Sequence, residues 1–167
     1  MDLFVVRHAI AFERDPSRWP NDADRPLTLE GEDRFRRAAA GLRTLVPTVD
    51  LMLASPFARA WRTAELLQEE AGWPIPERCE ELEADRPGVG TLAPLRRHSS
   101  RASVALVGHQ PSLGELASVL LAGSDDLVAI EIKKGGTLAL GVSRDVRPGN
   151  AVLRWALSPK VLRSLAR

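Results

Sequence analysis

Three short apolar runs in this chain each stop at polar residues, and a segment with helical character follows each of them. The runs are residues 3–6, 51–54 and 102–107. An apolar run of this length is typical of a strand buried on both faces, which is the usual state of a strand in a parallel sheet. Parallel strands need crossover connections, and the usual crossover is a helix. The repeated order therefore predicts a three-layer α/β/α fold built on a mostly parallel sheet.

Local signals mark the ends of the helices that follow these runs. Thr28 precedes an amphipathic segment with acidic residues in its first turn, and Pro47 follows it, as expected for a capped helix. Ser55 as N-cap with Pro56 at the first helical position begins a second helix, which Gly72 closes. The signals predict helices over residues 29–46, 56–71, 89–98 and 111–121.

The last third of the chain changes character. Residues 127–132, 136–142 and 151–157 have the composition of strands, with a Pro-Gly turn between the last two. Strands joined by so short a connection pair antiparallel. We therefore expect antiparallel strands at one edge of the sheet, together with a short strand over 75–79 and a basic terminal helix after residue 158.

Composition narrows the classes of function. The chain has 167 residues, 44% of them hydrophobic, which suffices for one core, so we expect a single domain over residues 1–167. The 23 Lys and Arg residues balance 22 Asp and Glu, which does not favour a nucleic-acid partner. No apolar run approaches the roughly 18 residues of a membrane span, and Cys79 is the single cysteine. These features predict a cytoplasmic protein with no membrane partner and no structural metal.

Basic residues stand where the strands end and the helices begin. Arg7 and His8 follow the first apolar run, His109 follows the third, and Arg59 lies one turn into the helix after the second. Because ligands of open α/β sheets bind beyond the carboxyl ends of the strands, these four side chains should form an anion site. Each has a structural alternative. Arg7 and His8 could be an incidental basic pair at a capped strand end, Arg59 could pair with Glu65 or Glu69 on the helix surface, and His109 could cap a helix or lie in the core.

These residues lie in motifs that resemble the histidine phosphatase superfamily, which has the phosphoglycerate-mutase-like fold, and within it the small phosphohistidine phosphatases of SixA type. Ala9 departs from the pattern, because the family has glycine there. The matching segments occur in the family's order and are Val6-Arg7-His8-Ala9, Arg25-Pro26-Leu27-Thr28 with Gly31, Ser55-Pro56-Phe57-Ala58-Arg59-Ala60 with Thr63, and Gly108-His109-Gln110-Pro111.

The resemblance implies a role for each basic residue. His8 is the expected nucleophile, which takes the phosphoryl group on an unprotonated ring nitrogen. Arg7, Arg59 and His109 are expected to bind the phosphoryl oxygens and to stabilise the charge of the transition state. A water molecule then hydrolyses the phosphohistidine intermediate. The resemblance implies no metal and no cofactor.

The general acid is less clearly marked. Relatives that cleave esters protonate the leaving oxygen with a carboxylate placed after the third strand, and the acidic stretch from Glu80 to Asp85 lies in that region. Glu81 matches the pattern best and Glu83 is second, while a solvated acidic loop is the structural alternative. Phosphohistidine needs such an acid less than an ester does, because it can leave as neutral imidazole.

The length of the chain bears on the substrate. Only a short stretch separates Trp73 from the strand at Ala102, which leaves no room for the inserted cap of relatives that act on small metabolites. An open site favours a phosphorylated protein, with phosphohistidine as the expected group, although the loop over 11–25 could fold over the site. The alternatives are a broad phosphomonoesterase that acts on small phosphorylated molecules and a non-catalytic module that binds phosphate.

Overall fold

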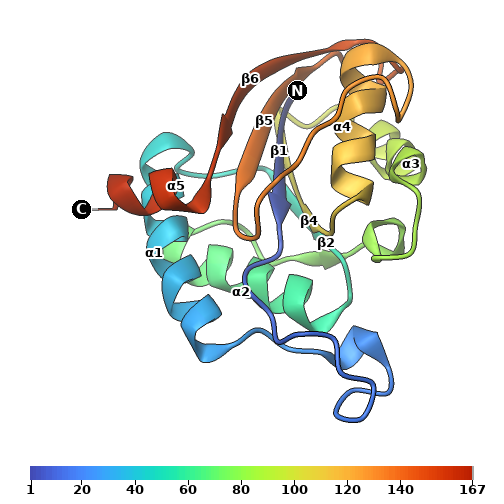
Figure 1. Ribbon diagram of the computed structural model, residues 1–167. Helices are drawn as coiled ribbons and strands as arrows, with labels where there is room; N and C mark the ends of the chain where they lie inside the picture. Colours follow the sequence, from blue (N-terminus) through green and yellow to red (C-terminus); the bar gives the residue numbers. More distant parts are fainter. Residues whose placement is uncertain (167) are drawn as a thin grey trace.

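A six-stranded mixed sheet forms the centre of the computed structural model, which describes residues 1–166 (Figure 1). The strand order is β3-β2-β4-β1-β5-β6, in which β3, β2, β4 and β1 run parallel, and β5 and β6 are antiparallel to their neighbours. This confirms the prediction of a mostly parallel sheet with antiparallel strands at one edge. The strands are β1 (Asp2–Arg7), β2 (Leu51–Ala54), β3 (Glu77–Arg78), β4 (Ser103–Gly108), β5 (Thr137–Val142) and β6 (Ala151–Leu157).

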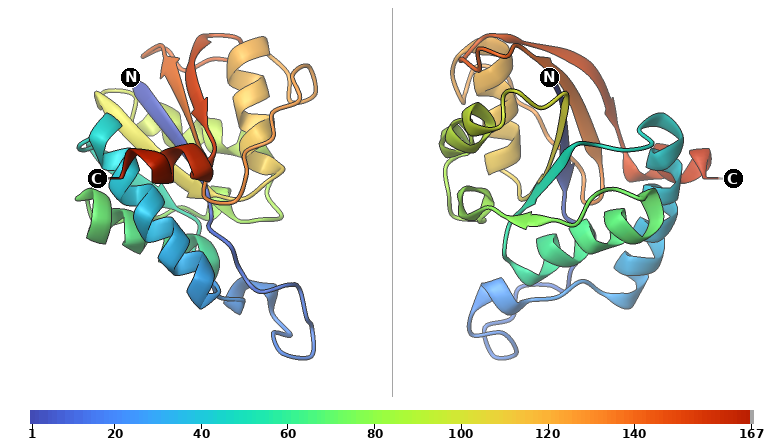
Figure 2. Two further views of the ribbon diagram at one scale, coloured as in Figure 1. Left: turned by 60° about the vertical axis from the view of Figure 1, so that its left-hand side comes forward. Right: turned by 180° about the vertical axis from the view of Figure 1, so that it is seen from behind.

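Helices cover both faces of the sheet (Figures 1 and 2). Helices α1, α2 and α5 pack on one face, and α3 and α4 pack on the other. None of the helices within residues 1–166 is both long enough and apolar enough to cross a membrane. The helices are α1 (Leu29–Leu45), α2 (Ala58–Ala71), α3 (Leu92–Arg97), α4 (Ser112–Ala122) and α5 (Pro159–Leu165), with short 3-10 turns η1 (Asp22–Asp24), η2 (Glu80–Leu82) and η3 (Gly88–Thr91).

The alternation of side chains along β1 divides the core into two halves. Phe4 and Val6 point to the half that contains α1, α2 and α5, whereas Leu3 and Val5 point to the half beneath α3 and α4. All four side chains are buried because β1 has a helix layer on each side. The strand that ends at the basic residues is therefore among the most rigidly packed parts of the fold.

The cap signals of α1 and α2 are largely confirmed. The Thr28 hydroxyl accepts a hydrogen bond from the Gly31 amide at 2.9 Å, and Gly72 closes α2 in the left-handed conformation with φ of 72°. A Cβ atom on Gly31 would lie 2.1 Å from the Ile10 carbonyl oxygen, so the motif glycine is required by close packing. Helix α2 begins at Ala58, two residues later than predicted, and Ser55 is not its N-cap.

One predicted strand is wrong. Residues 127–132 form an irregular segment beside the sheet. Side chains satisfy the backbone of this segment instead: Gln110 donates to the Ile130 carbonyl at 2.7 Å, and Arg7 donates to the Ile132 carbonyl at 2.9 Å. Two further elements are shorter than predicted, since the strand over 75–79 reduces to Glu77–Arg78 and the helix over 89–98 divides into η3 and α3.

Candidate active site

Four basic side chains meet where β1 and β4 end and α2 begins. Arg7 is the last residue of β1, with His8 after it, and His109 directly follows β4. The rings of the two histidines lie with their centroids 5.2 Å apart. Phe57 connects them to Arg59, because its ring centroid lies 5.3 Å from that of His109 and 5.2 Å from the guanidinium carbon. The structure thus brings together the four residues that the sequence analysis expected to find at one edge of the sheet.

The geometry of His8 sets its tautomer. Its Nδ1 lies 2.7 Å from the Ala9 carbonyl oxygen, so Nδ1 carries the proton and donates it, which leaves the Nε2 lone pair free. Burial, helped by the positive charges of Arg59 and Arg7, lowers the pKa of His8 to about 3 against the opposing effect of this hydrogen bond. A neutral imidazole with an unprotonated Nε2 is the form in which histidine acts as a nucleophile.

His109 is also held as a neutral imidazole. Burial lowers its pKa to about 2, with smaller contributions from His8 and Arg59. Its Nε2 lies 3.0 Å from the Ser55 hydroxyl oxygen. When Ser55 donates in this hydrogen bond, Nδ1 of His109 carries the proton and is available as a donor.

Arg59 is 3% exposed and contacts a carboxylate that the sequence analysis did not single out. Its Nη1 donates to the Asp22 carbonyl oxygen at 2.8 Å, and its Nη2 donates to Asp22 Oδ2 at 3.0 Å. The structural alternative for Arg59 fails, because Glu65 and Glu69 pair with Arg62 on the outer face of α2. Burial lowers the pKa of Arg59, although a guanidinium remains charged at any physiological pH.

Within residues 1–166, three buried nitrogen atoms of this cluster have no hydrogen-bond partner. They are Arg7 Nε, Arg59 Nε and His109 Nδ1, which belong to the three residues expected to bind phosphoryl oxygens. A buried polar atom without a partner costs about 1–3 kcal/mol, so native proteins leave few of them. A tetrahedral oxyanion presents acceptors in several directions and could satisfy donors that come from three different elements.

Glu81, the predicted general acid, forms its hydrogen bonds with residues outside this cluster. Its carboxylate accepts hydrogen bonds from Arg97 at 3.2 Å and from the Cys79 thiol at 3.3 Å, and from none of the four basic residues within the part of the chain described. A backbone hydrogen bond, Cys79 and Arg97 lower the pKa of Glu81, so this carboxylate is ionised. Glu83 pairs with Arg86.

No sequence signal distinguished Asp22 beforehand. It lies in a polar loop rich in turn-forming residues, where an aspartate is ordinary. Its contact with Arg59 spans 37 positions of the sequence, so neither helical nor strand periodicity reports it.

Ala9 fits its position without strain. Within residues 1–166 positive φ values occur at glycines alone, so Ala9 adopts an ordinary conformation. Its amide donates to the Thr63 hydroxyl at 3.0 Å, and that hydroxyl donates to the Arg59 carbonyl at 2.7 Å. Thr63 therefore connects the loop that carries His8 to the first turn of α2, and alanine in place of the family's glycine does not disturb the connection.

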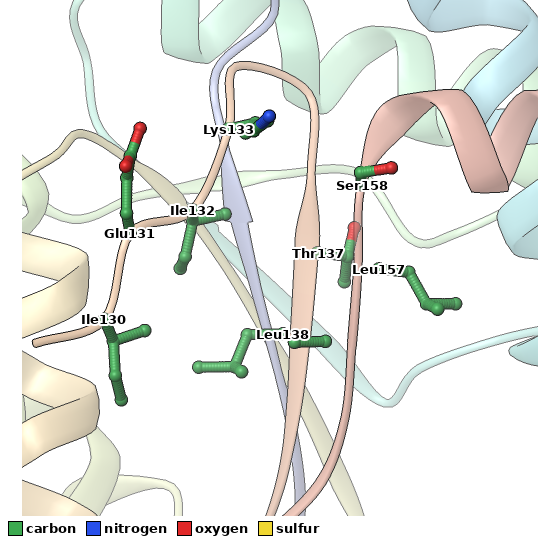
Figure 3. Close-up of a pocket in the computed structure, with 9 residues that line it drawn as sticks. Ile130, Glu131, Ile132, Lys133, Thr137, Leu138, Leu157 and Ser158 are labelled. Atoms are coloured by element: carbon green, nitrogen blue, oxygen red, sulfur yellow. The ribbon is translucent and has the colours of Figure 1, made fainter. Parts of the chain in front are cut away.

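A cavity of about 170 Å³ lies beside the cluster, between the segment over 130–133 and the β5-β6 hairpin (Figure 3). Glu131 and Ile132 line it, and both also act on Arg7: the Glu131 charge opposes the lowering of the Arg7 pKa by burial, and the Ile132 carbonyl accepts from Arg7 Nη1. None of the four basic side chains lines this cavity, so it is a neighbour of the oxyanion site and not a part of it.

Acid should destabilise the fold through the two buried imidazoles. Their pKa values of about 3 and about 2 lie below the ordinary value near 6.5, so between these limits the unfolded chain binds protons that the folded chain does not. Stability therefore falls as the pH drops below about 6.5, by up to about 1.4 kcal/mol per pH unit for each histidine.

Urea unfolding at pH 7 and pH 5 measures this effect. We expect His109→Asn to lose less stability on acidification than the parent chain. The matched control is His98→Asn, at the end of α3 and outside the cluster, which should follow the parent. Equal acid sensitivity of the parent and His109→Asn would contradict the pKa assigned to His109.

Comparison with known proteins identifies a family model and relatives that match this chain. The family model of the Histidine phosphatase superfamily (branch 1) matches residues 3–85. An uncharacterized protein of Picosynechococcus sp. is 38% identical over 97% of this chain and 99% of its own length. Phosphohistidine phosphatase SixA of Escherichia coli is 28% identical over 95% of this chain and 94% of its own length.

Solved structures extend the likeness to the whole fold. The structure of the protein histidine phosphatase SixA complexed with tungstate superposes with a TM-score of 0.84 and 27% identity, covering 97% of this chain and 99% of that one. A putative alpha-ribazole-5'-P phosphatase from Escherichia coli shares the fold with a TM-score of 0.74 at 19% identity, over 95% and 98% of the two chains. The motifs, the strand order and these matches together show that this chain belongs to the histidine phosphatase superfamily.

Proposed function

We propose that this chain dephosphorylates phosphohistidine on a protein, with His8 as the nucleophile. Membership of the superfamily supports a phosphatase that works through a histidine. The observation that carries the proposal is the set of three unpartnered buried donors on Arg7, Arg59 and His109, next to an imidazole whose Nε2 is free. This is the arrangement that an in-line transfer of a phosphoryl group to His8 requires.

The first step transfers the phosphoryl group to the enzyme. The Nε2 lone pair of His8 forms a bond to phosphorus while the bond from phosphorus to the substrate imidazole breaks, and the bonding pair leaves with that nitrogen. When the other ring nitrogen of the substrate is protonated, the leaving group is neutral imidazole and needs no further proton. The hydrogen bond from His8 Nδ1 to the Ala9 carbonyl stabilises the positive charge that develops on the attacking ring.

The second step releases phosphate. A water oxygen bonds to phosphorus, the bond from phosphorus to Nε2 breaks, and the proton of the water passes to solvent. In both steps the equatorial oxygens carry the negative charge, which Arg7 and Arg59 stabilise as fixed cations and His109 as a hydrogen-bond donor. His8 returns to its neutral tautomer, ready for another cycle.

A protein substrate is supported by the dimensions of the chain. It matches SixA over 95% of its own length and 94% of that protein, so it carries no inserted domain relative to a phosphatase named for phosphohistidine. Between α2 and β4 the chain forms β3, two 3-10 turns and the six residues of α3. A stretch this short contains no inserted cap to enclose a small molecule, which supports a protein substrate.

A small phosphate ester is the second candidate substrate, because a putative alpha-ribazole-5'-P phosphatase shares the fold. An alkoxide leaving group needs a proton, and we propose Glu81 as its donor. Glu81 would have to exchange its contact with Arg97 for one with the leaving oxygen, and because its pKa is lowered it is ionised and has no proton to donate in the present arrangement. Both features favour phosphohistidine over an ester.

A comparison of two substrates tests this assignment. The first is a protein phosphorylated chemically on histidine, and the second is β-glycerol phosphate, an alkyl ester whose leaving group is an alkoxide. We expect a higher kcat/KM for the phosphohistidine protein. We expect Glu81→Gln to lower ester hydrolysis by about 10²-fold and to change phosphohistidine hydrolysis by less than about threefold, because only the ester needs an acid.

Glu83→Gln is the control for Glu81→Gln, since it removes a carboxylate from the same acidic stretch. Equal kcat/KM values for the two substrates would identify a broad phosphomonoesterase. Phosphate binding without turnover of either substrate would identify a phosphate-binding module.

A further inference from the structure

Asp22 holds the buried Arg59 guanidinium by two hydrogen bonds of different kinds. Its backbone carbonyl accepts from Nη1 at 2.8 Å and its carboxylate accepts from Nη2 at 3.0 Å. A guanidinium is planar and rigid, so two contacts on separate nitrogens fix both its position and the orientation of its plane. Of the N–H groups that remain, that of Nε is buried and has no hydrogen-bond partner within residues 1–166.

Asp22 is itself held by a residue of the Arg25-Pro26-Leu27-Thr28 motif. Arg25 Nε donates to Asp22 Oδ1 at 2.8 Å and its Nη2 donates to Oδ2 at 3.5 Å, so the carboxylate lies between Arg25 and Arg59. Arg25 Nη1 donates to the Phe12 carbonyl at 2.6 Å, which fastens the group to the opposite limb of the loop. Arg25, a residue of the motif with no part in the two steps of the reaction, therefore holds the carboxylate that contacts Arg59.

The loop that carries Asp22 would otherwise be loosely attached. Residues 11–25 project from the body of the molecule and are stabilised internally by Phe12 and Trp19, whose ring centroids lie 5.2 Å apart (Figure 2). The guanidinium of Arg18 lies over both rings. The Asp22 contact therefore joins a projecting loop to a guanidinium at the start of α2.

Asp22 is not suited to donate a proton in this arrangement. Hydrogen bonding by Arg25 and the charge of Arg59 lower the pKa of Asp22 against the effect of burial, so its carboxylate is ionised. Its role must therefore act through the arginines that surround it.

We propose that Asp22, held in turn by Arg25, is the positioning residue for Arg59. It fixes the two Nη atoms so that the Nε edge faces the phosphoryl group. This inference rests on the proposed function, in which Arg59 binds the oxygens of the phosphoryl group. A negative charge beside an anion site weakens anion binding, so Asp22 lowers the affinity for the anion while it aligns the group that stabilises the transition state.

This double effect predicts that turnover and anion binding change in opposite directions. We expect Asp22→Ala to lower kcat by about 10- to 100-fold, because a displacement of about 1 Å in a positioning group has costs of this size. We expect tungstate, a tetrahedral oxyanion, to bind Asp22→Ala up to about tenfold more tightly, because the site loses a negative charge. A residue with a merely structural role would lower both.

Steady-state kinetics on both substrates and calorimetric titration with tungstate measure these effects. Asp22→Asn keeps the backbone contact and one oxygen acceptor, so its kcat should lie between those of the parent and Asp22→Ala. The control is Asp24→Ala, which removes the same charge from an exposed position of the same turn and should match the parent in both measurements.

A double variant tests whether Arg25 acts through Asp22. Arg25→Ala should lower kcat, and adding it to Asp22→Ala should cause little further loss, because both substitutions release the same guanidinium. Fully additive losses would show that Arg25 acts independently and would refute this part of the proposal.

Three other outcomes are decisive. If Asp22→Ala keeps the kcat of the parent but binds tungstate more tightly, Asp22 only competes with the anion for the guanidinium of Arg59. If Asp22→Ala and Asp24→Ala have the same kcat and the same tungstate affinity, Asp22 has no role in positioning Arg59. Either result overturns the positioning proposal without touching the proposed function. If the parent chain turns over neither substrate, the proposed function is refuted. In that case the tungstate titration still tests the effect of Asp22 on Arg59, and equal affinities of Asp22→Ala and Asp24→Ala would refute this effect.

Discussion

Replacing His8 with asparagine should lower the turnover of every phosphorylated substrate by at least about 10⁴-fold. Asparagine has no lone pair on nitrogen that can attack phosphorus, so the covalent route is lost. Among the four basic residues, His8 is the one whose free Nε2 and lowered pKa of about 3 fit the nucleophile. Rapid quenching of the parent with radiolabelled substrate should trap a phosphoenzyme that is labile in acid and absent from the variant.

Two measurements separate this loss from misfolding. His8→Asn should still bind tungstate, because Arg7, Arg59 and His109 remain, and its unfolding midpoint in urea should stay close to that of the parent. His98→Asn is the matched control and should retain full activity, since it lies outside the cluster. Comparable turnover in His8→Asn and the parent would remove His8 from the reaction.

Replacing Arg59 with alanine should lower kcat/KM by about 10³-fold or more, in the range found for arginines that stabilise phosphoryl transfer. The variant loses a fixed positive charge and the Nε donor, and it leaves the Asp22 carboxylate close to the bound anion. Lysine should restore little of the loss, because one ammonium cannot keep both contacts to Asp22 and also present a further donor in a fixed direction.

Arg62→Ala is the control for Arg59→Ala. Arg62 lies in the same helix and pairs with Glu32, Glu65 and Glu69 on the surface, so its removal should leave kcat/KM within about threefold of the parent. If the two variants lost activity equally, the effect would arise from helix α2 as a whole and not from the guanidinium of Arg59.

Several features of the fold followed from local chemistry that can be read along the chain. Continuous apolar runs predicted buried parallel strands, and Thr28 and Gly72 marked ends of helices α1 and α2. The convergence of His8 and His109 also followed, because parallel strands present their carboxyl ends at one edge whatever the details of packing. In each case a short segment carries its own signal, so its neighbours in the fold need not be known.

Long-range contacts decided the rest. Residues 127–132 have the composition of a strand, but side chains of Arg7 and Gln110 bind the carbonyl groups of this segment, and only the assembled fold shows this. Glu81 and Asp22 are both acidic residues in polar segments, and the sequence does not distinguish them. The structure turns Glu81 toward Arg97 and places Asp22 on Arg59, because side chains far apart in sequence become neighbours only when the helices and loops have packed on the sheet.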